Sequence, residues 1–293
     1  MTEELMVTTR GGIDAAELRR RLLAGAPVSE RRIEAAGIST AVLEGGAGEP
    51  LLLLHGPGEH VLKWLGVLPA LVATNRVIAP DLPGHGATMM NGRAVTTERA
   101  LEWIEGVIDA TCGSPPTVVA QTMSGAMAAT YAAGRGGRIR RLVLVDTLGL
   151  APFDPAPEFG AALGEYFARP DRDTFEGVMR YCMHDADRLK REAGDAWEPF
   201  TAYTLDRVRD PEGREALDAL MERFGYPAIP ADTLASIRVP VSLIWGRQDL
   251  ATRLAVAEAA ARRYGWPLSV IDHCGDDPVM EQPQRFLEAL RRA

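Results

Sequence analysis

Short, mainly apolar runs alternate with longer stretches of helical periodicity, and this alternation limits the possible folds more than any other feature of the chain. Six runs rich in leucine and β-branched residues lie at 51–54, 76–79, 117–120, 142–145, 241–245 and 268–271. Such runs are typical of strands buried on both faces. Helical spacing lies between them, for example at 99–108 and 254–263. The pattern predicts an α/β fold with a mostly parallel, doubly wound, twisted sheet flanked by helices.

Before the first run, an antiparallel pair of strands is expected at 33–44 and an amphipathic helix at 15–23. After the fourth run, about 90 residues lack strand character and contain helical stretches at 158–167, 172–183, 197–208 and 212–224. An insertion of this length predicts a helical lid over the carboxyl ends of the strands, where ligands bind in parallel sheets. We therefore expect a core formed by 1–150 and 236–293, with a helical cap at 151–235.

The charge and cysteine content restrict the partners. A net charge of −8 disfavours nucleic acid and anionic membranes as partners. The three cysteines are scattered, so we expect neither a metal site nor a disulfide framework. The sequence contains no glycine-rich phosphate-binding loop, so neither a nucleotide nor another cofactor is expected. Without a secretory leader or an apolar run of about 18 residues, we expect a cytoplasmic protein that acts on a small molecule. The sequence does not indicate an oligomeric state.

Four motifs follow one another along the chain, around the predicted cap. They are HGPG at 55–58, APDLPGHG at 79–86, WGRQD at 245–249 and GDDPVMEQP at 275–283. In that order they resemble the HG-x-G turn, the D-x-x-G-x-G loop, the acid turn and the histidine loop of the α/β-hydrolase superfamily. The resemblance covers the chain from about position 33 and implies the α/β-hydrolase fold. It says much less about function, because one fold hosts many reactions.

The resemblance also identifies the nucleophile position. The segment AQTMSG at 120–125 matches the family's elbow, G-x-S-x-G, which implies that Thr122 occupies the nucleophile position. The flanking Ala120 and Ser124 are small, as this sharp turn requires. β-Branching is disfavoured in the strained elbow backbone, and a threonine nucleophile needs a nearby base. Thr122 is therefore either an unusual nucleophile or a hydroxyl that bonds a ligand, and Ser124 is a weaker candidate inside the helix start.

The position of the family's catalytic histidine is occupied by Asp276. An aspartate, with a reference pKa of about 4, is a weak base toward a hydroxyl, and its side chain is shorter. Asp249 matches the triad acid. If Asp249 faces Asp276 in a shielded pocket, the pKa of one carboxyl rises and the pair becomes a proton shuttle. The alternative is two solvated aspartates at a pocket edge.

The five histidines offer alternatives for the missing base. His55 belongs to its turn, and His85 is expected to be structural. His60 is expected near the pocket mouth, His184 in the cap, and His273 near the end of the last strand. Any of these last three would replace the base if it reached the Thr122 hydroxyl.

The resemblance implies an oxyanion hole made of two backbone N–H groups. One belongs to Met123, and the other belongs to the residue after His-Gly, which here is Pro57 and has no N–H. Gly58 would substitute if the turn is shifted, and Gly56, Pro57 and Gly58 are expected to line the ligand site. Loss of one donor lowers the rate of acyl transfer on the order of 100-fold or more.

Nucleophile, base and oxyanion donor are thus all altered, which argues against an ordinary Ser-His-Asp esterase. Three interpretations stay open. In the first, Asp276, helped by Asp249, is a general acid/base and Thr122 bonds a small, mainly apolar substrate in a cyclisation, dehydration, isomerisation or lyase step suited to specialised metabolism. In the second, the protein is a slow or atypical hydrolase with Thr122 as nucleophile. In the third, it is a non-catalytic binder.

Overall fold

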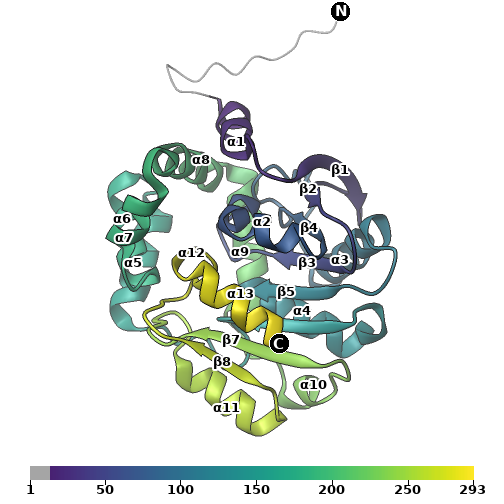
Figure 1. Cartoon of the computed structure of the whole chain (residues 1–293). Coiled ribbons are helices and arrows are strands. Elements are labelled where there is room, and N and C mark those ends of the chain that lie inside the picture. The colour runs from purple at the N-terminus through teal and green to yellow at the C-terminus, as the bar shows by residue number, and fades with distance from the viewer. Residues whose placement is uncertain (1–13) are drawn as a thin grey trace, which may run out of the picture.

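Eight strands form one sheet in a computed structural model that describes residues 14–293. They are β1 (Ser29–Ala35), β2 (Ile38–Gly45), β3 (Pro50–Leu54), β4 (Arg76–Pro80), β5 (Thr117–Gln121), β6 (Arg141–Val145), β7 (Val241–Gly246) and β8 (Leu268–Ile271). Their order across the sheet is β1-β2-β4-β3-β5-β6-β7-β8. Only β1–β2 and β2–β4 pair antiparallel, and the other neighbours are parallel. The predicted fold class is confirmed (Figure 1).

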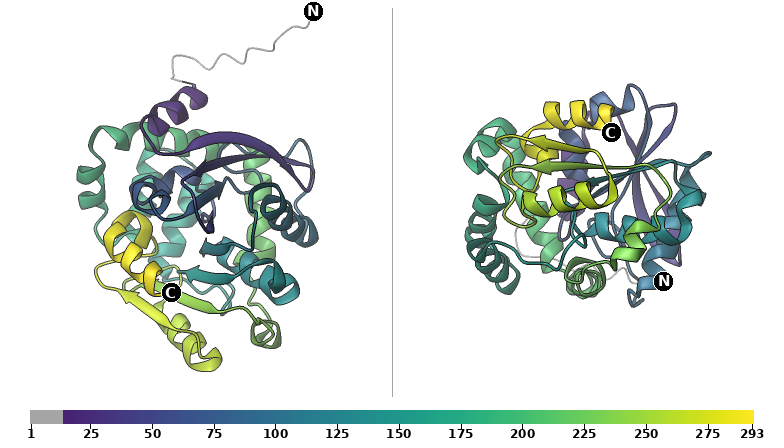
Figure 2. Two further views of the ribbon diagram at one scale, coloured as in Figure 1. Left: turned by 45° about the vertical axis from the view of Figure 1, so that its right-hand side comes forward. Right: turned by 90° about the horizontal axis from the view of Figure 1, so that it is seen from below.

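Helices cover both faces of the sheet because successive side chains of a strand point to opposite faces. Leu52 and Leu54 of β3 belong to one apolar core, and Leu51 and Leu53 belong to a second. The first core includes residues of α3 (Thr97–Thr111), α4 (Met123–Arg135), α10 (Ala231–Ala235) and α11 (Leu254–Tyr264). The second includes residues of η1 (Val61–Gly66), α2 (Leu68–Val72), α12 (Pro278–Glu281) and α13 (Pro283–Arg292). A short turn, η2 (Gly136–Arg138), follows α4, and Figure 2 shows the layered arrangement.

The chain between β6 and β7 is helical, as expected. It forms α5 (Pro157–Ala168), α6 (Arg172–Cys182), α7 (Ala186–Ala193), η3 (Gly194–Ala196), α8 (Trp197–Arg209), α9 (Pro211–Leu220) and the π-turn η4 (Met221–Gly225). Phe175, Trp197 and Leu205 help to form a separate apolar cluster among these helices. In Figure 1 this cap, α5 to α8, stands beside the sheet. The boundaries at 150 and 235 stay a prediction.

The helix α1 (Ala15–Leu23), expected from the sequence, ties the core to the cap through one buried arginine. Arg19 lies 2.9 Å from Asp81 of the core and donates to the hydroxyl of Tyr203 in α8 at 2.9 Å. Asp81 also accepts the Val61 amide at 2.8 Å, which fixes the start of η1. Since a buried charge is stable only when it is paired, this contact holds α8 in one position over the core. Within the described part of the chain, no helix has the length and hydropathy to span a bilayer.

Candidate active site

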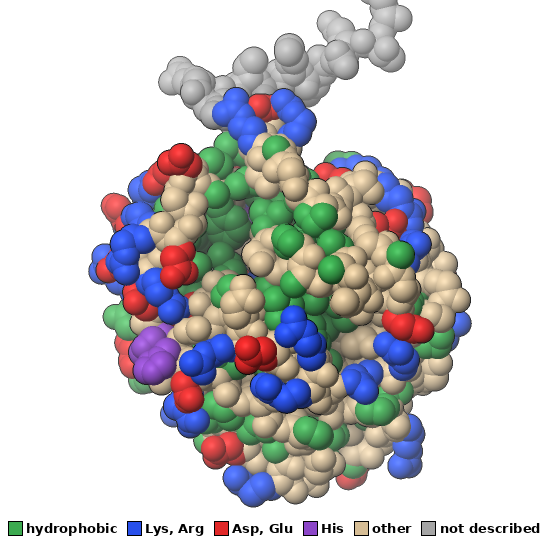
Figure 3. Space-filling model, viewed as in Figure 1, with side chains coloured by type: hydrophobic (Ala, Val, Ile, Leu, Met, Phe, Trp, Pro, Cys, Tyr) green, Lys and Arg blue, Asp and Glu red, His purple; other side chains and the backbone are tan. Residues whose placement is uncertain are grey.

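A cavity of about 140 Å³ lies between the carboxyl ends of the strands and the cap. Apolar cap residues form most of its wall, namely Phe159, Leu163, Tyr166, Phe167, Phe175, Val178, Met179, Met183 and Met221. Its polar lining comes from Glu59, Gln121, Thr122, Cys182, Thr204, Asp276 and Asp277. Apolar cavities of about 150 Å³ accept a molecule the size of benzene. In Figure 3, apolar side chains gather in the hollow between the cap and the core.

Thr122 sits at the sharp turn between β5 and α4, with φ 48° and ψ −117°. A positive φ is strained for a β-branched residue, so the packing around the turn must hold it. At Gly125, a side chain would overlap Thr147, which explains the small residue there. The Ser124 hydroxyl donates to the carbonyl of Leu54 at 3.0 Å and is buried, so it serves the helix start and not the cavity.

The Thr122 hydroxyl is buried, and no hydrogen-bond partner for it exists among residues 14–293. Neither an imidazole nor the Asp276 carboxyl reaches it. A methyl group placed on Gly56 would lie 2.5 Å from Thr122 Oγ1 and 2.8 Å from Glu59 Oε2. The hydroxyl and the Glu59 carboxylate therefore approach the same side of Gly56, and both line the cavity.

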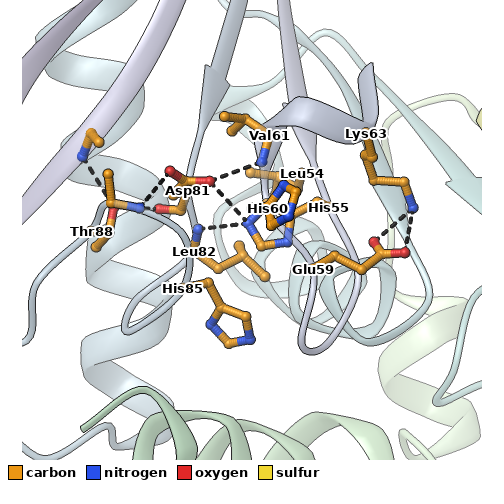
Figure 4. Close-up of polar contacts among 12 residues, drawn as sticks. Leu54, His55, Glu59, His60, Val61, Lys63, Asp81, Leu82, His85 and Thr88 are labelled. Carbon is orange, nitrogen blue, oxygen red and sulfur yellow. Dashed lines mark hydrogen bonds and ion pairs between the residues drawn. The ribbon is translucent and has the colours of Figure 1, made fainter. Parts of the chain in front are cut away.

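Glu59 was not predicted from the sequence, yet it occupies the oxyanion turn. Its Oε2 accepts the Gly56 amide at 2.6 Å, and it also accepts Lys63 Nζ at 2.6 Å, a contact drawn in Figure 4. Lys63 is buried and also lies 3.0 Å from Oδ2 of Asp277. The only sequence signal for this ion pair was the i,i+4 spacing of Glu59 and Lys63. Since Pro57 has no N–H, the turn keeps no donor from Gly56 or Pro57 for an oxyanion.

Asp276 lies half-buried at the cavity, and its backbone fixes it there. Its amide donates to the Cys182 carbonyl, and its carbonyl accepts Gln121 Nε2, both at 2.9 Å. Burial, reinforced by Asp249 and other nearby carboxylates, raises the pKa of Asp276 well above its usual value. The raised pKa favours the protonated carboxyl, which is the form that a general acid requires.

Asp249 lies beside a second buried carboxyl group, that of Asp146, which the sequence analysis did not single out. Asp249 Oδ1 accepts the amides of Ala251 and Thr252 at 2.7 and 2.8 Å, and Asp146 Oδ1 accepts the Gly246 amide at 2.8 Å. Neither Oδ2 atom has a hydrogen-bond partner among the described residues, and each carboxyl is close enough to affect the pKa of the other, which favours one proton shared between them. Burial raises the pKa of both, that of Asp249 to about 7.

The interaction expected between Asp249 and Asp276 thus also involves the carboxyl of Asp146. Asp249 acts on Asp276 through its charge, which is the largest cause after burial of the raised pKa of Asp276. Asp146 follows β6 just as Asp249 follows β7, and adjacent parallel strands bring both to the same edge of the sheet. Among the described residues, these carboxyls form no group of three that could hold a metal ion.

Residues 51–289 match the model of the alpha/beta hydrolase family. The chain belongs to the α/β-hydrolase family. It is 30% identical over 279 residues to 2-hydroxymuconate semialdehyde hydrolase of Pseudomonas sp. (strain CF600), covering 89% of this chain and 92% of that protein. It is 25% identical over 274 residues to 2-hydroxy-6-oxo-6-(2'-aminophenyl)hexa-2,4-dienoic acid hydrolase of Metapseudomonas resinovorans, covering 89% of each.

Two solved structures illustrate how widely the fold is shared. Naproxen esterase of Bacillus subtilis superimposes with a TM-score of 0.81 at 18% identity, over 97% of this chain and 98% of the esterase. A meta-cleavage product hydrolase of Pseudomonas fluorescens IP01 gives 0.76 at 23% identity, over 91% and 97% of the two chains. At these identities the likeness concerns the fold alone.

None of the five histidines of this α/β hydrolase, all of which lie within residues 14–293, forms a hydrogen bond with the Thr122 hydroxyl. His60, expected at the pocket mouth, is not among the residues that line the cavity, because its ring packs 4.7 Å from that of Tyr203 and bonds Thr204 at 2.9 Å. Burial lowers the pKa of His60 to about 3, so it is neutral. His184 and His273 lie exposed, with ring centroids 5.4 Å apart.

His55 and His85 bond backbone groups of the loop at 82–83, and two of the expected oxyanion residues line the cavity. His55 accepts the Leu82 amide at 3.0 Å, and His85 bonds the carbonyl of Pro83 at 2.9 Å. Pro57 and Gly58 line the cavity, as expected. Met123 is the first residue of α4, so its N–H has no partner within the helix and stays available as an oxyanion donor.

Proposed function

We propose that this α/β hydrolase is an enzyme that transfers protons to and from a small, mainly apolar molecule, in a cyclisation, dehydration, isomerisation or lyase step. The observation that carries the proposal is the buried Thr122 hydroxyl, which faces the cavity without a base. Carboxyl groups from Glu59 and Asp276 line the same cavity. The site therefore offers proton donors and acceptors where a nucleophile and its base would otherwise lie.

The two carboxyl groups have different surroundings, which suits different roles. Burial and neighbouring carboxylates oppose the ionisation of Asp276, which suits it to the role of proton donor. Glu59 accepts hydrogen bonds from Lys63 and the Gly56 amide, which stabilise a carboxylate, so it is the acceptor. Pairs of carboxyls in contrasting environments are a common basis for acid/base assignment. The Thr122 hydroxyl then bonds the substrate oxygen and orients it.

The oxyanion turn supports this reading over acyl transfer. A tetrahedral intermediate needs preorganised donors for its negative oxygen. Here the Gly56 amide already bonds the Glu59 carboxylate at 2.6 Å, and Pro57 has no N–H. A developing oxyanion at this turn would meet a carboxylate, which raises the barrier to ester hydrolysis.

The proposal is tested by proton exchange at the α-carbon of small ketones. Cyclohexanone and related cyclic ketones fit the cavity, and exchange in deuterium oxide is followed by proton NMR. The Asp276→Ala and Asp276→Asn variants are expected to lose exchange by 10²-fold or more, the range of general acid/base catalysis. The control is Asp218→Asn, an exposed position on α9. Unchanged exchange in Asp276→Ala, or binding without exchange by the unmodified enzyme, contradicts the proposal, and the second result would indicate a binding protein.

A second candidate is a slow hydrolase that uses Thr122 as nucleophile. It is favoured by the relative of 30% identity, which is named a hydrolase, and by the strained elbow geometry at Thr122. Its chemistry differs from the first proposal in one respect that can be measured, which is a covalent bond to Thr122.

A further inference from the structure

The polar end of the cavity holds an excess of carboxyl groups over cations. Glu59, Asp276 and Asp277 line it, whereas no Lys, Arg or His does among the described residues. The nearest cation, Lys63, is buried beneath the lining and already bonds Glu59 at 2.6 Å and Asp277 at 3.0 Å. One ammonium group thus serves two carboxyl groups, which leaves this end of the cavity with more acidic side chains than cations.

Two further polar atoms at the cavity lack partners. Thr122 is 9% exposed, and its Oγ1 makes no hydrogen bond with any described residue. Gln121 is 1% exposed, and its Oε1 is likewise unpartnered, while its Nε2 already donates to the Asp276 carbonyl. A buried amide oxygen without a donor is unfavourable, so a bound group that donates hydrogen bonds would satisfy it. This end of the cavity therefore has hydrogen-bond acceptors without matching donors.

Building on the proposed function, we infer that the substrate carries a protonated amine beside a hydrocarbon portion of about benzene size. An ammonium group supplies three donors and one positive charge, which matches the free acceptors Gln121 Oε1 and Thr122 Oγ1 and the excess of carboxyl groups over cations at Glu59 and Asp277. The hydrocarbon portion lies against the apolar cap wall, where Phe175 is one of the aromatic residues.

An anionic substrate is disfavoured by the same contacts. A carboxylate in the cavity would find no lysine, arginine or histidine on the lining formed by the described residues, and it would face Glu59 and Asp277. Burying a charge without a partner is costly, and like charges in a shielded site repel strongly. A neutral ligand avoids the repulsion but leaves the excess carboxylate unpaired. The expected order of affinity is cation, then neutral molecule, then anion.

Three probes of one size test this order on the full chain. Benzylammonium, benzyl alcohol and benzoate are titrated at pH 7 by isothermal titration calorimetry. Benzylammonium is expected to bind at least about tenfold more tightly than benzyl alcohol, the effect of one charge-assisted contact, and benzoate is expected not to bind. Benzoate binding as tightly as benzylammonium, or no binding by any of the three, overturns the inference.

A variant identifies the residue responsible. Glu59→Gln keeps the side-chain shape and is expected to weaken benzylammonium binding about tenfold while benzyl alcohol binding stays the same. Equal weakening of both ligands contradicts the inference. If Glu59→Gln does not fold, the comparison of the three ligands on the unmodified protein still decides. Because this assay measures affinity without turnover, its failure is distinct from a failure of proton exchange on ketones.

Discussion

Replacing Asp249 with asparagine tests whether Asp146 and Asp249 share a proton. Asparagine has the shape of a protonated aspartate. Its Oδ1 keeps accepting the Ala251 and Thr252 amides, now bonded to Asp249 at 2.7 and 2.8 Å. Its Nδ2 donates to Asp146 Oδ2, an oxygen that has no other partner. The variant therefore makes permanently the bond that the unmodified protein makes only while it holds the proton.

The size of the effect follows from the pKa of Asp249, which burial raises from 3.8 to about 7. The folded protein holds a proton that the unfolded chain releases, so this stabilisation is complete below about pH 4 and is lost as the pH rises to about 7. At about 1.4 kcal/mol per pKa unit, the whole window corresponds to about 4 kcal/mol of unfolding free energy. The Asp249→Asn variant does not lose this stability as the pH rises, because asparagine does not titrate.

Urea denaturation at intervals from pH 4.5 to pH 8 measures the difference. The stability of Asp249→Asn relative to the unmodified protein is expected to increase with pH, by up to about 4 kcal/mol. The exposed Asp218→Asn variant serves as a control and should follow the unmodified protein throughout. Parallel stability curves for Asp249→Asn and the unmodified protein would refute the shared proton.

Two further substitutions test the ion pair and the turn beside the elbow. Lys63→Met leaves the carboxylates of Glu59 and Asp277 without their cation and should destabilise the protein by about 3–5 kcal/mol, seen as a lower Tm; an unchanged Tm would show that the pair is not buried as described. Gly56→Ala places a methyl group 2.5 Å from Thr122 Oγ1 and should lower the free energy of unfolding by about 1–3 kcal/mol, measured by urea denaturation. The same variant should not bind benzylammonium, and normal binding would contradict the geometry of the turn.

The sequence predicts the elements with strong apolar patterns and misses those without them. The apolar run at 142–145 lies in β6, as predicted, and all four of its residues are buried. By contrast, β1 begins at Ser29 rather than near position 33, since its first four residues are exposed on an edge strand. The helix α7 was not expected, because Leu189 is its one buried residue. The expected helix at 212–224 divides into α9 and η4.

The candidate site was predictable only where a local motif marks a position. Thr122, Asp249 and Asp276 follow from their places in such motifs. Glu59 and Asp146 do not, because their roles depend on contacts made in the folded chain. Glu59 turns back onto an amide three residues earlier, and Asp146 meets Asp249 across two neighbouring strands. The spacing of residues along one strand or helix does not encode either contact.

The central claim is that the elbow hydroxyl is not a nucleophile, and covalent labelling tests it most directly. The full-length protein is incubated with an alkyl fluorophosphonate, and its intact mass and tryptic peptides are measured. Thr122 Oγ1 has no base within hydrogen-bond distance among the described residues, so the mass is expected to stay unchanged. A phosphonate adduct on Thr122 would contradict this expectation and establish the second candidate, a hydrolase with a threonine nucleophile.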